Sequence, residues 1–155
     1  MKNLTSINAI NILLVEDNEG DIILTLEALS EVGLDKYVTV VKDGEHAMAY
    51  LKNCIIDSSN SFPNMILLDI NLPKVDGKQV LSFIKSTEAL RHIPVIMLTT
   101  SNAQIDINES YSNYANCYLT KPVDLETFFG LIQCIQTHWI EVVKLPLTYN
   151  NSIVN

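Results

Sequence analysis

The chain has 155 residues, of which 48% are hydrophobic, and its formal net charge is -8 at pH 7. This length fits one domain with a packed core and leaves little room for a second. The acidic balance argues against a protein that binds nucleic acid through a basic face. No apolar run reaches bilayer length and the N-terminus lacks the pattern of a signal peptide, so we expect a cytoplasmic protein that does not enter a membrane.

The first half of the chain alternates short apolar runs with amphipathic segments. Residues 10–15 form a near-continuous apolar run, as expected for a parallel strand buried on both faces. Residues 19–32 repeat apolar side chains at helical spacing and stop before a glycine, where a helix is expected to end. Residues 37–41 are expected to form an edge strand, and the next helix is expected to begin at Asp43 or Gly44.

The second half repeats this alternation after a polar loop at residues 57–63. The expected strands cover residues 65–68, 94–98 and 117–119. The expected helices are one that carries Val80, Leu81 and Ile84, one at 103–114, and one from Asp124 to about Val143. Asn and Ser residues specify the helix at 103–114 poorly, whereas Asp124 is a typical helix cap.

Five strands that alternate with five helices predict an α/β fold with right-handed crossovers. The most favoured arrangement is a flavodoxin-like doubly wound parallel sheet with strand order 2-1-3-4-5. In this interpretation residues 10–143 form the domain, residues 1–9 an N-terminal extension and residues 144–155 a flexible C-terminal tail.

Polar residues suited to chemistry stand at the carboxyl ends of four expected strands. Asp17 follows the first strand and Asp69 follows the third. Thr99 and Lys121 come at the ends of the fourth and fifth strands. Ligands of open α/β sheets bind in the crevice beyond these ends. We therefore expect the four side chains to form a site where a carboxylate accepts a phosphoryl group beside a divalent cation.

The adjacent acids Glu16 and Asp17 support this interpretation. Together with Asp69 they would repel one another and raise their pKa values unless a cation neutralised them. Mg²⁺ suits such a site, because it binds one or two carboxylates, water and phosphate. Asp69 is then the candidate nucleophile, while Lys121 and Thr99 would bind the phosphoryl oxygens.

The chain resembles the receiver domain of two-component response regulators in four segments: ILLVEDNEGD, MILLDINLPKVDG, PVIMLTTS and CYLTKP. The resemblance covers residues 10 to about 141. It implies that Asp69 accepts a phosphoryl group from a sensor histidine kinase in a magnesium-dependent reaction. It also implies a metal site formed by Glu16, Asp17, Asp69 and the main-chain carbonyl of Asn71. Glu16 stands where many receivers have aspartate, and its longer side chain favours a water-bridged metal contact.

The same resemblance implies how the signal would leave the site. Thr99 and Tyr118 match the switch hydroxyl and switch aromatic of the family, and Lys121 matches its lysine before proline. Such a domain is a signalling protein and not an enzyme, apart from self-catalysed phosphoryl transfer and autodephosphorylation. The VEDNxGD start and the TTS segment further resemble small stand-alone receivers, which include partners of phytochrome-type sensor kinases.

The output is expected to be protein–protein interaction, including a homodimer. The last predicted helix carries more apolar residues than one core-facing stripe requires: Leu131, Cys134, Trp139, Ile140, Val142 and Val143. We predict dimerisation through the face of the fourth helix, fifth strand and fifth helix. Packing of these side chains within the monomer is the alternative.

Three other classes of protein share parts of this pattern. A flavodoxin-like cofactor binder is excluded, because the loop after the first strand, EDNEGD, is acidic where a phosphate would sit. Asp69, Ile70 and Asn71 faintly resemble the motif of aspartate-dependent phosphatases, but the stretch after the fourth strand lacks their later acidic motif. A pseudo-receiver, which binds partners without phosphorylation, is the alternative function that we retain.

Overall fold

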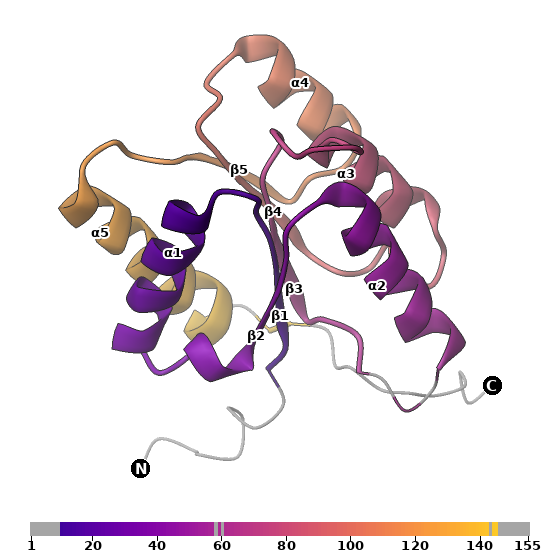
Figure 1. Ribbon diagram of the computed structural model, residues 1–155, viewed down its shortest axis with the longest axis horizontal. Helices are drawn as coiled ribbons and strands as arrows, with labels where there is room; N and C mark the ends of the chain where they lie inside the picture. The colour runs from indigo at the N-terminus through magenta and orange to yellow at the C-terminus, as the bar shows by residue number, and fades with distance from the viewer. Residues whose placement is uncertain (1–9, 58, 60, 143, 146–155) are drawn as a thin grey trace.

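Among the described residues, five parallel strands form one sheet in the order β2-β1-β3-β4-β5, which confirms the predicted flavodoxin-like topology (Figure 1). The computed structural model describes residues 10–57, 59, 61–142 and 144–145. The predicted N-terminal extension, residues 1–9, and most of the predicted tail, residues 144–155, lie outside this part. The strands are β1 (Ile12–Val15), β2 (Val38–Val41), β3 (Met65–Leu68), β4 (Val95–Thr99) and β5 (Cys117–Thr120).

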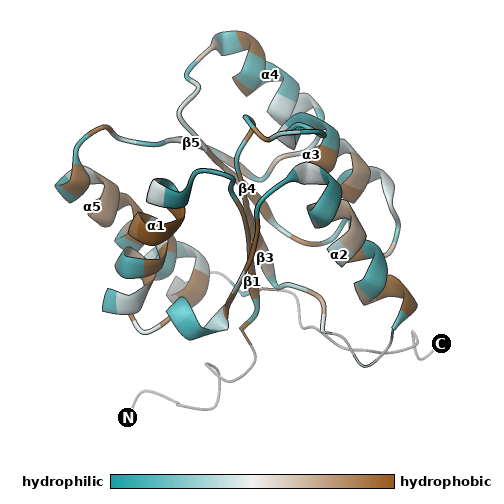
Figure 2. Cartoon of the chain, in the orientation of Figure 1, coloured by the Kyte–Doolittle hydropathy of each residue, from teal (hydrophilic) through white to brown (hydrophobic). Residues whose placement is uncertain are grey.

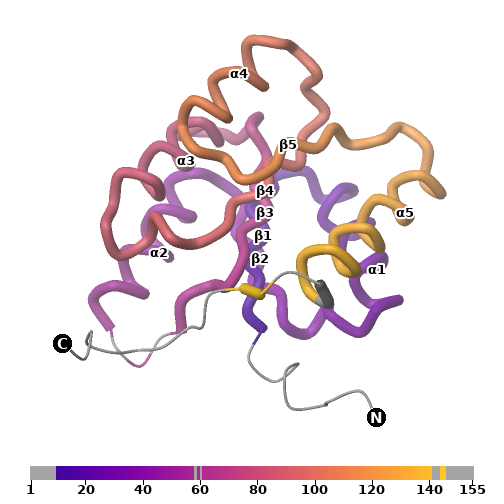
Figure 3. The backbone as a smooth tube through the Cα atoms, turned by 180° about the vertical axis from the view of Figure 1, so that it is seen from behind, coloured from indigo at the N-terminus to yellow at the C-terminus, as the bar shows by residue number. Residues whose placement is uncertain are grey.

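Helices cover both faces of the sheet, as a doubly wound fold requires. The α-helices are α1 (Glu19–Glu31), α2 (Gly44–Ile56), α3 (Gly77–Ser86), α4 (Gln104–Ser112) and α5 (Leu125–Ile135). Figures 1 and 3 show α1 and α5 on one face of the sheet and α2, α3 and α4 on the other. A 3-10 helix, η2 (Asp35–Tyr37), precedes β2. In the part of the chain that the structure describes, no helix is both long and apolar enough to cross a membrane.

The last helix differs from the single regular helix predicted from Asp124 to about Val143. The α-helical part ends at Ile135, and a π-helix, η3 (Gln136–Val142), continues the chain. A π-helix has i→i+5 hydrogen bonds, so the apolar spacing of an α-helix does not continue through it. Trp139 and Ile140 are partly buried against the core. The transition from α-helix to π-helix therefore coincides with tertiary packing, which the spacing of apolar residues in the sequence does not predict.

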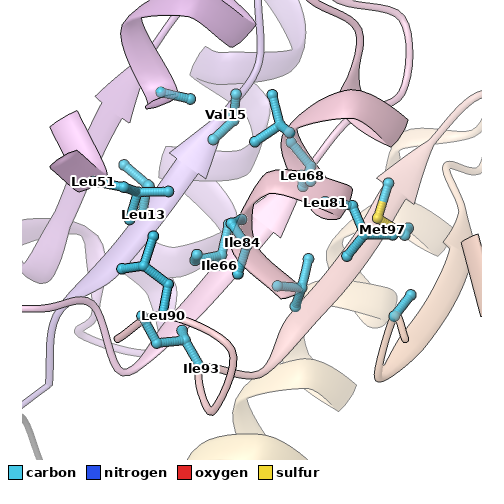
Figure 4. Close-up of a cluster of buried hydrophobic side chains, with 14 of the residues drawn as sticks. Leu13, Val15, Leu51, Ile66, Leu68, Leu81, Ile84, Leu90, Ile93 and Met97 are labelled. Atoms are coloured by element: carbon cyan, nitrogen blue, oxygen red, sulfur yellow. The ribbon is translucent and has the colours of Figure 1, made fainter. Parts of the chain in front are cut away.

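The sheet separates two apolar clusters. Leu13 and Val15 of β1 point into the first cluster, between the sheet and α2 and α3 (Figure 4). Ile12 and Leu14 of the same strand point into the second, which α1 and α5 cover. Figure 2 accordingly shows the central strands as hydrophobic and much of the helix surface as hydrophilic. Burial on both faces explains why β1 reads as a continuous apolar run.

Candidate functional site

Main-chain hydrogen bonds continue the sheet past the strand ends and bring the predicted site residues to one edge. The N–H of Asp69 donates to the carbonyl of Val15 at 3.1 Å, and the N–H of Lys121 donates to that of Thr99 at 2.7 Å. Asp69, Thr99 and Lys121 are all buried. The residues at the ends of β1, β3, β4 and β5 therefore share the carboxyl edge of the sheet, where ligands of this architecture bind.

The turn after β3 fixes the main chain around Asp69. The N–H of Gly77 donates to the carbonyl of Ile70 at 2.8 Å, and Asp76 caps α3 in a capping box with Gln79. A Cβ atom on Gly77 would lie 2.0 Å from the main-chain oxygen of Asp69. Only glycine permits this close approach of α3 to the strand end.

Three acids form a cluster that could hold a metal ion. Glu16, Asp17 and Asp69 each offer a carboxylate oxygen, and these atoms lie within 4.8 Å of one another. Glu16 and Asp69 are buried, whereas Asp17 is exposed and can face solvent. Oxygen donors with an open side suit a hard divalent cation that retains water. The residues present therefore fit the predicted metal.

Glu16 has a perturbed pKa. Burial raises its pKa to about 7, although the hydrogen bond from Lys121 opposes this rise. Both of its oxygens already accept hydrogen bonds: Oε1 from the Asn18 N–H at 3.1 Å and Oε2 from Lys121 Nζ. A carboxylate held in this way favours the water-bridged metal contact expected from its length.

Asn71 follows Asp69 by two residues and lies at the same edge. Its main-chain N–H is 3.3 Å from Asp69 Oδ1, which accepts the hydrogen bond. The contact of its carbonyl with a metal stays a prediction. Asp69 thus has one oxygen toward the main chain of this turn and the other toward Lys121.

Lys121 is the ammonium at the centre of the acids. Its Nζ donates to Glu16 Oε2, to Asp21 Oδ2 at 3.0 Å and to Asp69 Oδ2 at 3.2 Å. Burial alone would lower the pKa of Lys121, but the hydrogen bond to Glu16 and the charges of Asp69 and Glu16 outweigh it. The pKa rises to about 12, so the side chain stays charged at neutral pH.

Asp21 is a site residue that sequence reasoning missed. It lies in the first turn of α1, where acids are common because they interact favourably with the helix dipole. Its position within the VEDNxGD segment was the only indication in the sequence. That position does not show whether the acid only stabilises the first turn of a helix or also binds Lys121. The side chain is about one-third exposed, at 31%.

The two predicted switch residues lie on the neighbouring strands β4 and β5, and a third residue joins them. Thr99 is fully buried, and its Oγ1 accepts a hydrogen bond from the Ser101 N–H at 3.3 Å. Tyr118 is partly buried, and its hydroxyl donates to the Ser101 carbonyl at 2.9 Å. Sequence reasoning did not assign Ser101 a role, because its contacts with Thr99 and Tyr118 are made by main-chain atoms.

Comparison with known proteins decides the family. Residues 12–133 match the model of the response regulator receiver domain. The chain belongs to this family. The matched residues lie within the domain predicted at 10–143 and contain every residue of the candidate site.

Two response regulators illustrate the similarity. Rcp1 of Synechocystis sp. PCC 6803 is 44% identical over 135 residues, which cover 87% of this chain and 92% of Rcp1. The crystal structure of Rcp1 in its Mn²⁺-bound form has a TM-score of 0.80 and covers 87% of this chain and 97% of that chain. The phosphorylated cyanobacterial phytochrome response regulator RcpA has 44% identity and a TM-score of 0.82, over 88% of this chain and 97% of its own. The predicted resemblance to small phytochrome-associated response regulators is therefore confirmed.

Proposed function

We propose that this response regulator accepts a phosphoryl group on Asp69 from a sensor histidine kinase and signals through protein–protein contacts. The observation that carries the proposal is the buried Asp69 carboxylate, which lies 3.2 Å from the Lys121 ammonium and within a cluster of acids that fits a metal. In this role the protein is a signalling component and not an enzyme that turns over a separate substrate. Its cytoplasmic location and its lack of a nucleic-acid partner stay predictions.

The metal that we propose is Mg²⁺, held by Glu16, Asp17, Asp69 and the carbonyl of Asn71, with Glu16 bound through water. The Mn²⁺-bound form of Rcp1 supports a divalent cation in a close relative. When bound, the cation would offset the negative charge of the acids and of the incoming phosphoryl group. Mg²⁺ suits this site because it binds to one or two carboxylates, retains water and binds phosphate.

Asp69 would act as the nucleophile. One of its carboxylate oxygens attacks phosphorus while the bond from phosphorus to the kinase histidine breaks, and the released imidazole keeps the electron pair. Lys121 holds the carboxylate in place and would then bind a phosphoryl oxygen, because its ammonium already lies within hydrogen-bonding distance of Asp69. Its raised pKa keeps that charge available at neutral pH.

Thr99 and Tyr118 would convert phosphorylation into a change of surface. The Thr99 hydroxyl can leave the Ser101 N–H and donate to a phosphoryl oxygen, and Tyr118 can fill the space that Thr99 vacates. The Thr99 movement exchanges one hydrogen bond for another, so phosphorylation need only shift the populations of two arrangements. The surface formed by α4, β5 and α5 would then expose different side chains and bind different partners.

A phytochrome-type sensor kinase is the partner that we propose as the phosphoryl donor. The support is the similarity to RcpA, a phytochrome response regulator, at 44% identity over nearly its whole length. The input signal would then be light, received by the kinase and not by this chain.

We also propose a homodimer through the face of α4, β5 and α5. Part of the apolar excess that suggested it packs within the monomer, because Leu131, Trp139 and Ile140 are partly buried against the second cluster. Val142 and Val143 lie outside what the structure describes of side chains. The remaining support comes from exposed side chains on this face: Ile105 and Tyr111 of α4 and Leu125 of α5.

Incubation with acetyl phosphate tests the main proposal. Intact-mass analysis should find one added phosphoryl group in the wild type with Mg²⁺, and none after chelation of divalent cations. The Asp69→Asn variant should take up none under either condition, while Asp57→Asn, at an exposed acid beyond α2, should behave as the wild type.

A wild type that stays unmodified with Mg²⁺ would contradict the proposed function. It would favour the pseudo-receiver, which binds its partners without phosphorylation. Uptake in Asp69→Asn would instead place the modification on another residue.

A further inference from the structure

Ser101, two residues beyond Thr99, contacts both residues of the proposed switch. Its N–H donates to Thr99 Oγ1, and its carbonyl accepts from the Tyr118 hydroxyl. Movement of either switch side chain therefore breaks a contact with the same loop residue. Whatever holds Ser101 in place also holds the resting positions of Thr99 and Tyr118.

Three charged side chains connect Ser101 to α3. The Ser101 hydroxyl donates to Asp106 Oδ2 at 2.5 Å, and Asp106 Oδ1 accepts from Lys78 Nζ at 2.9 Å. Lys78 Nζ also donates to Glu109 Oε2 at 2.5 Å. We call Lys78, Asp106 and Glu109 the α3–α4 latch, because the first lies on α3 and the other two on the neighbouring helix α4 (Figures 1 and 3).

The latch is partly shielded from water. The side chains of Lys78 and Asp106 are only 25% and 19% exposed. Exposed ion pairs contribute little because water and salt screen them. Here each partner also has one further hydrogen bond, since Lys78 donates to Glu109 and Asp106 accepts from Ser101. The hydrogen bonds from Ser101 and Lys78 hold the pKa of Asp106 below its ordinary value. The carboxylate thus stays charged and available to Lys78 at neutral pH.

The position of Lys78 is not explained by the stability of its own helix. It occupies the first turn of α3, which contains no acidic residue. A cation at a helix N-terminus interacts unfavourably with the helix dipole. Lys78 therefore opposes the local preference, and its contacts with α4 are what offset that cost.

Apart from the latch and a hydrogen bond that the Tyr111 hydroxyl accepts from the Tyr118 N–H at 3.1 Å, few contacts anchor α4. Ser110 is the only buried residue among Gln104–Ser112, and its hydroxyl has no hydrogen-bond partner among the described residues. The helix begins at Gln104, and its N-cap residue, Ala103, makes no capping hydrogen bond with its side chain. Ile105 and Tyr111 remain largely exposed. A helix with so little apolar burial depends on polar contacts for its position.

We propose that the α3–α4 latch is a positioning device that keeps α4 and Ser101, and through Ser101 the Thr99 and Tyr118 side chains, in the resting arrangement. The latch starts one residue after Gly77, whose main chain touches that of Asp69. It therefore joins the phosphoacceptor turn directly to α4. This inference rests on the proposed function, and it assigns Lys78 the role of setting how readily Asp69 is phosphorylated.

The test compares four proteins by the initial rate of phosphorylation with acetyl phosphate and Mg²⁺, read by intact mass. Lys78→Met should react about threefold faster than the wild type, because loss of one modest ion-pair network shifts a two-state population by about that factor. Lys78→Arg should restore the wild-type rate. Lys52→Met is the matched control: it removes a lysine that joins α2 to Phe83 of α3, and it should leave the rate unchanged.

Amide hydrogen exchange of α4 provides the second measurement. Exchange should accelerate in Lys78→Met and in Asp106→Asn, but not in Lys52→Met. If hydrogen exchange in Lys78→Met is the same as in the wild type, the latch does not hold α4. If exchange is faster but the phosphorylation rate is unchanged, Lys78 is only a structural contact. Either result overturns the inference. If the wild-type protein takes up no phosphoryl group, the proposed function is contradicted. The hydrogen-exchange comparison then tests by itself whether Lys78 holds α4.

Discussion

At the scale of single residues, the site is governed by one ammonium shared among three carboxylates. Lys121 is buried beside Glu16 and Asp69, and Asp21 approaches it from the first turn of α1. Burial makes each of these charges costly unless a partner of opposite sign is present. A divalent cation bound at these acids would therefore compete with Lys121 for carboxylate oxygens, and each would partly replace the other.

Removal of Lys121 should separate metal binding from phosphorylation. In Lys121→Met, the unneutralised acids should bind Mg²⁺ on the order of tenfold more tightly, since an opposing charge at contact distance is lost. The rate of Asp69 phosphorylation should fall about a hundredfold, because a donor to the phosphoryl oxygens is missing. Titration calorimetry and intact mass measure the two quantities.

The control for this prediction is Lys42→Met. Lys42 pairs with Glu19 on the surface, where both side chains are more than half exposed. Its loss should change neither quantity. Weaker Mg²⁺ binding in Lys121→Met would refute the idea that the ammonium and the cation compete.

The sequence predicted the residues of the site better than their contacts. Asp17, Asp69, Thr99 and Lys121 could be found because parallel strands end at one edge, so position along the chain determines position in the sheet. Asp21 and Ser101 could not be found in this way. Asp21 contacts Lys121 because of the direction of its side chain, and Ser101 contacts the switch residues through main-chain atoms of a loop. Neither property can be recognised from the residue types.

At the scale of elements, the close approach of α3 to β3 is a tight constraint near the site. The N-terminal residue of α3, Gly77, abuts the main chain of Asp69, whereas Gly130 in α5 has open space around it. The same substitution at these two glycines should therefore have opposite effects on stability.

Gly77→Ala should lower the free energy of unfolding by about 2–3 kcal/mol, because the added methyl group must displace main-chain atoms. Gly130→Ala should raise it by about 1 kcal/mol, because alanine is the better helix former. Urea unfolding at equilibrium measures both. Equal effects of the two substitutions would contradict the described packing of α3 against β3.

The helices also differ in how far their sequences specify them. The capping box and the apolar stripe of α3 appear in its sequence and in the structure. Residues 103–114 were predicted as a poorly specified helix, and α4 is shorter, from Gln104 to Ser112, with little burial. The π-helix after Ile135 could not be predicted, because packing of Trp139 and Ile140 against the core accompanies it and the apolar period does not indicate it.

At the scale of the whole molecule, the predicted order of the strands is confirmed, whereas the homodimer stays a prediction. Apolar runs buried on both faces and alternation with helices allow few topologies. Association between copies depends on exposed apolar side chains. The helical spacing of apolar residues in the sequence does not distinguish such side chains from those of the core. The proposed dimer therefore needs a measurement in solution.

Sedimentation velocity over a range of concentrations tests the dimer. Ile105→Lys should weaken self-association at least about tenfold, because burial of an isoleucine side chain contributes about 1.5–3 kcal/mol. Ile56→Lys changes an equally apolar and more exposed residue of α2 and should associate as the wild type does. A wild type that stays monomeric at every concentration, with and without a phosphoryl analogue, would remove the proposal.

The reach of Lys121 across the sheet also bears on how the protein is made. Its ammonium meets Glu16 from a position 105 residues later in the chain. During synthesis the acids emerge long before the lysine that neutralises them, so a partial chain that ends before Lys121 cannot contain the assembled cluster. If Asp69 accepts a phosphoryl group as proposed, competence for that reaction would be acquired only once β5 and Lys121 are in place.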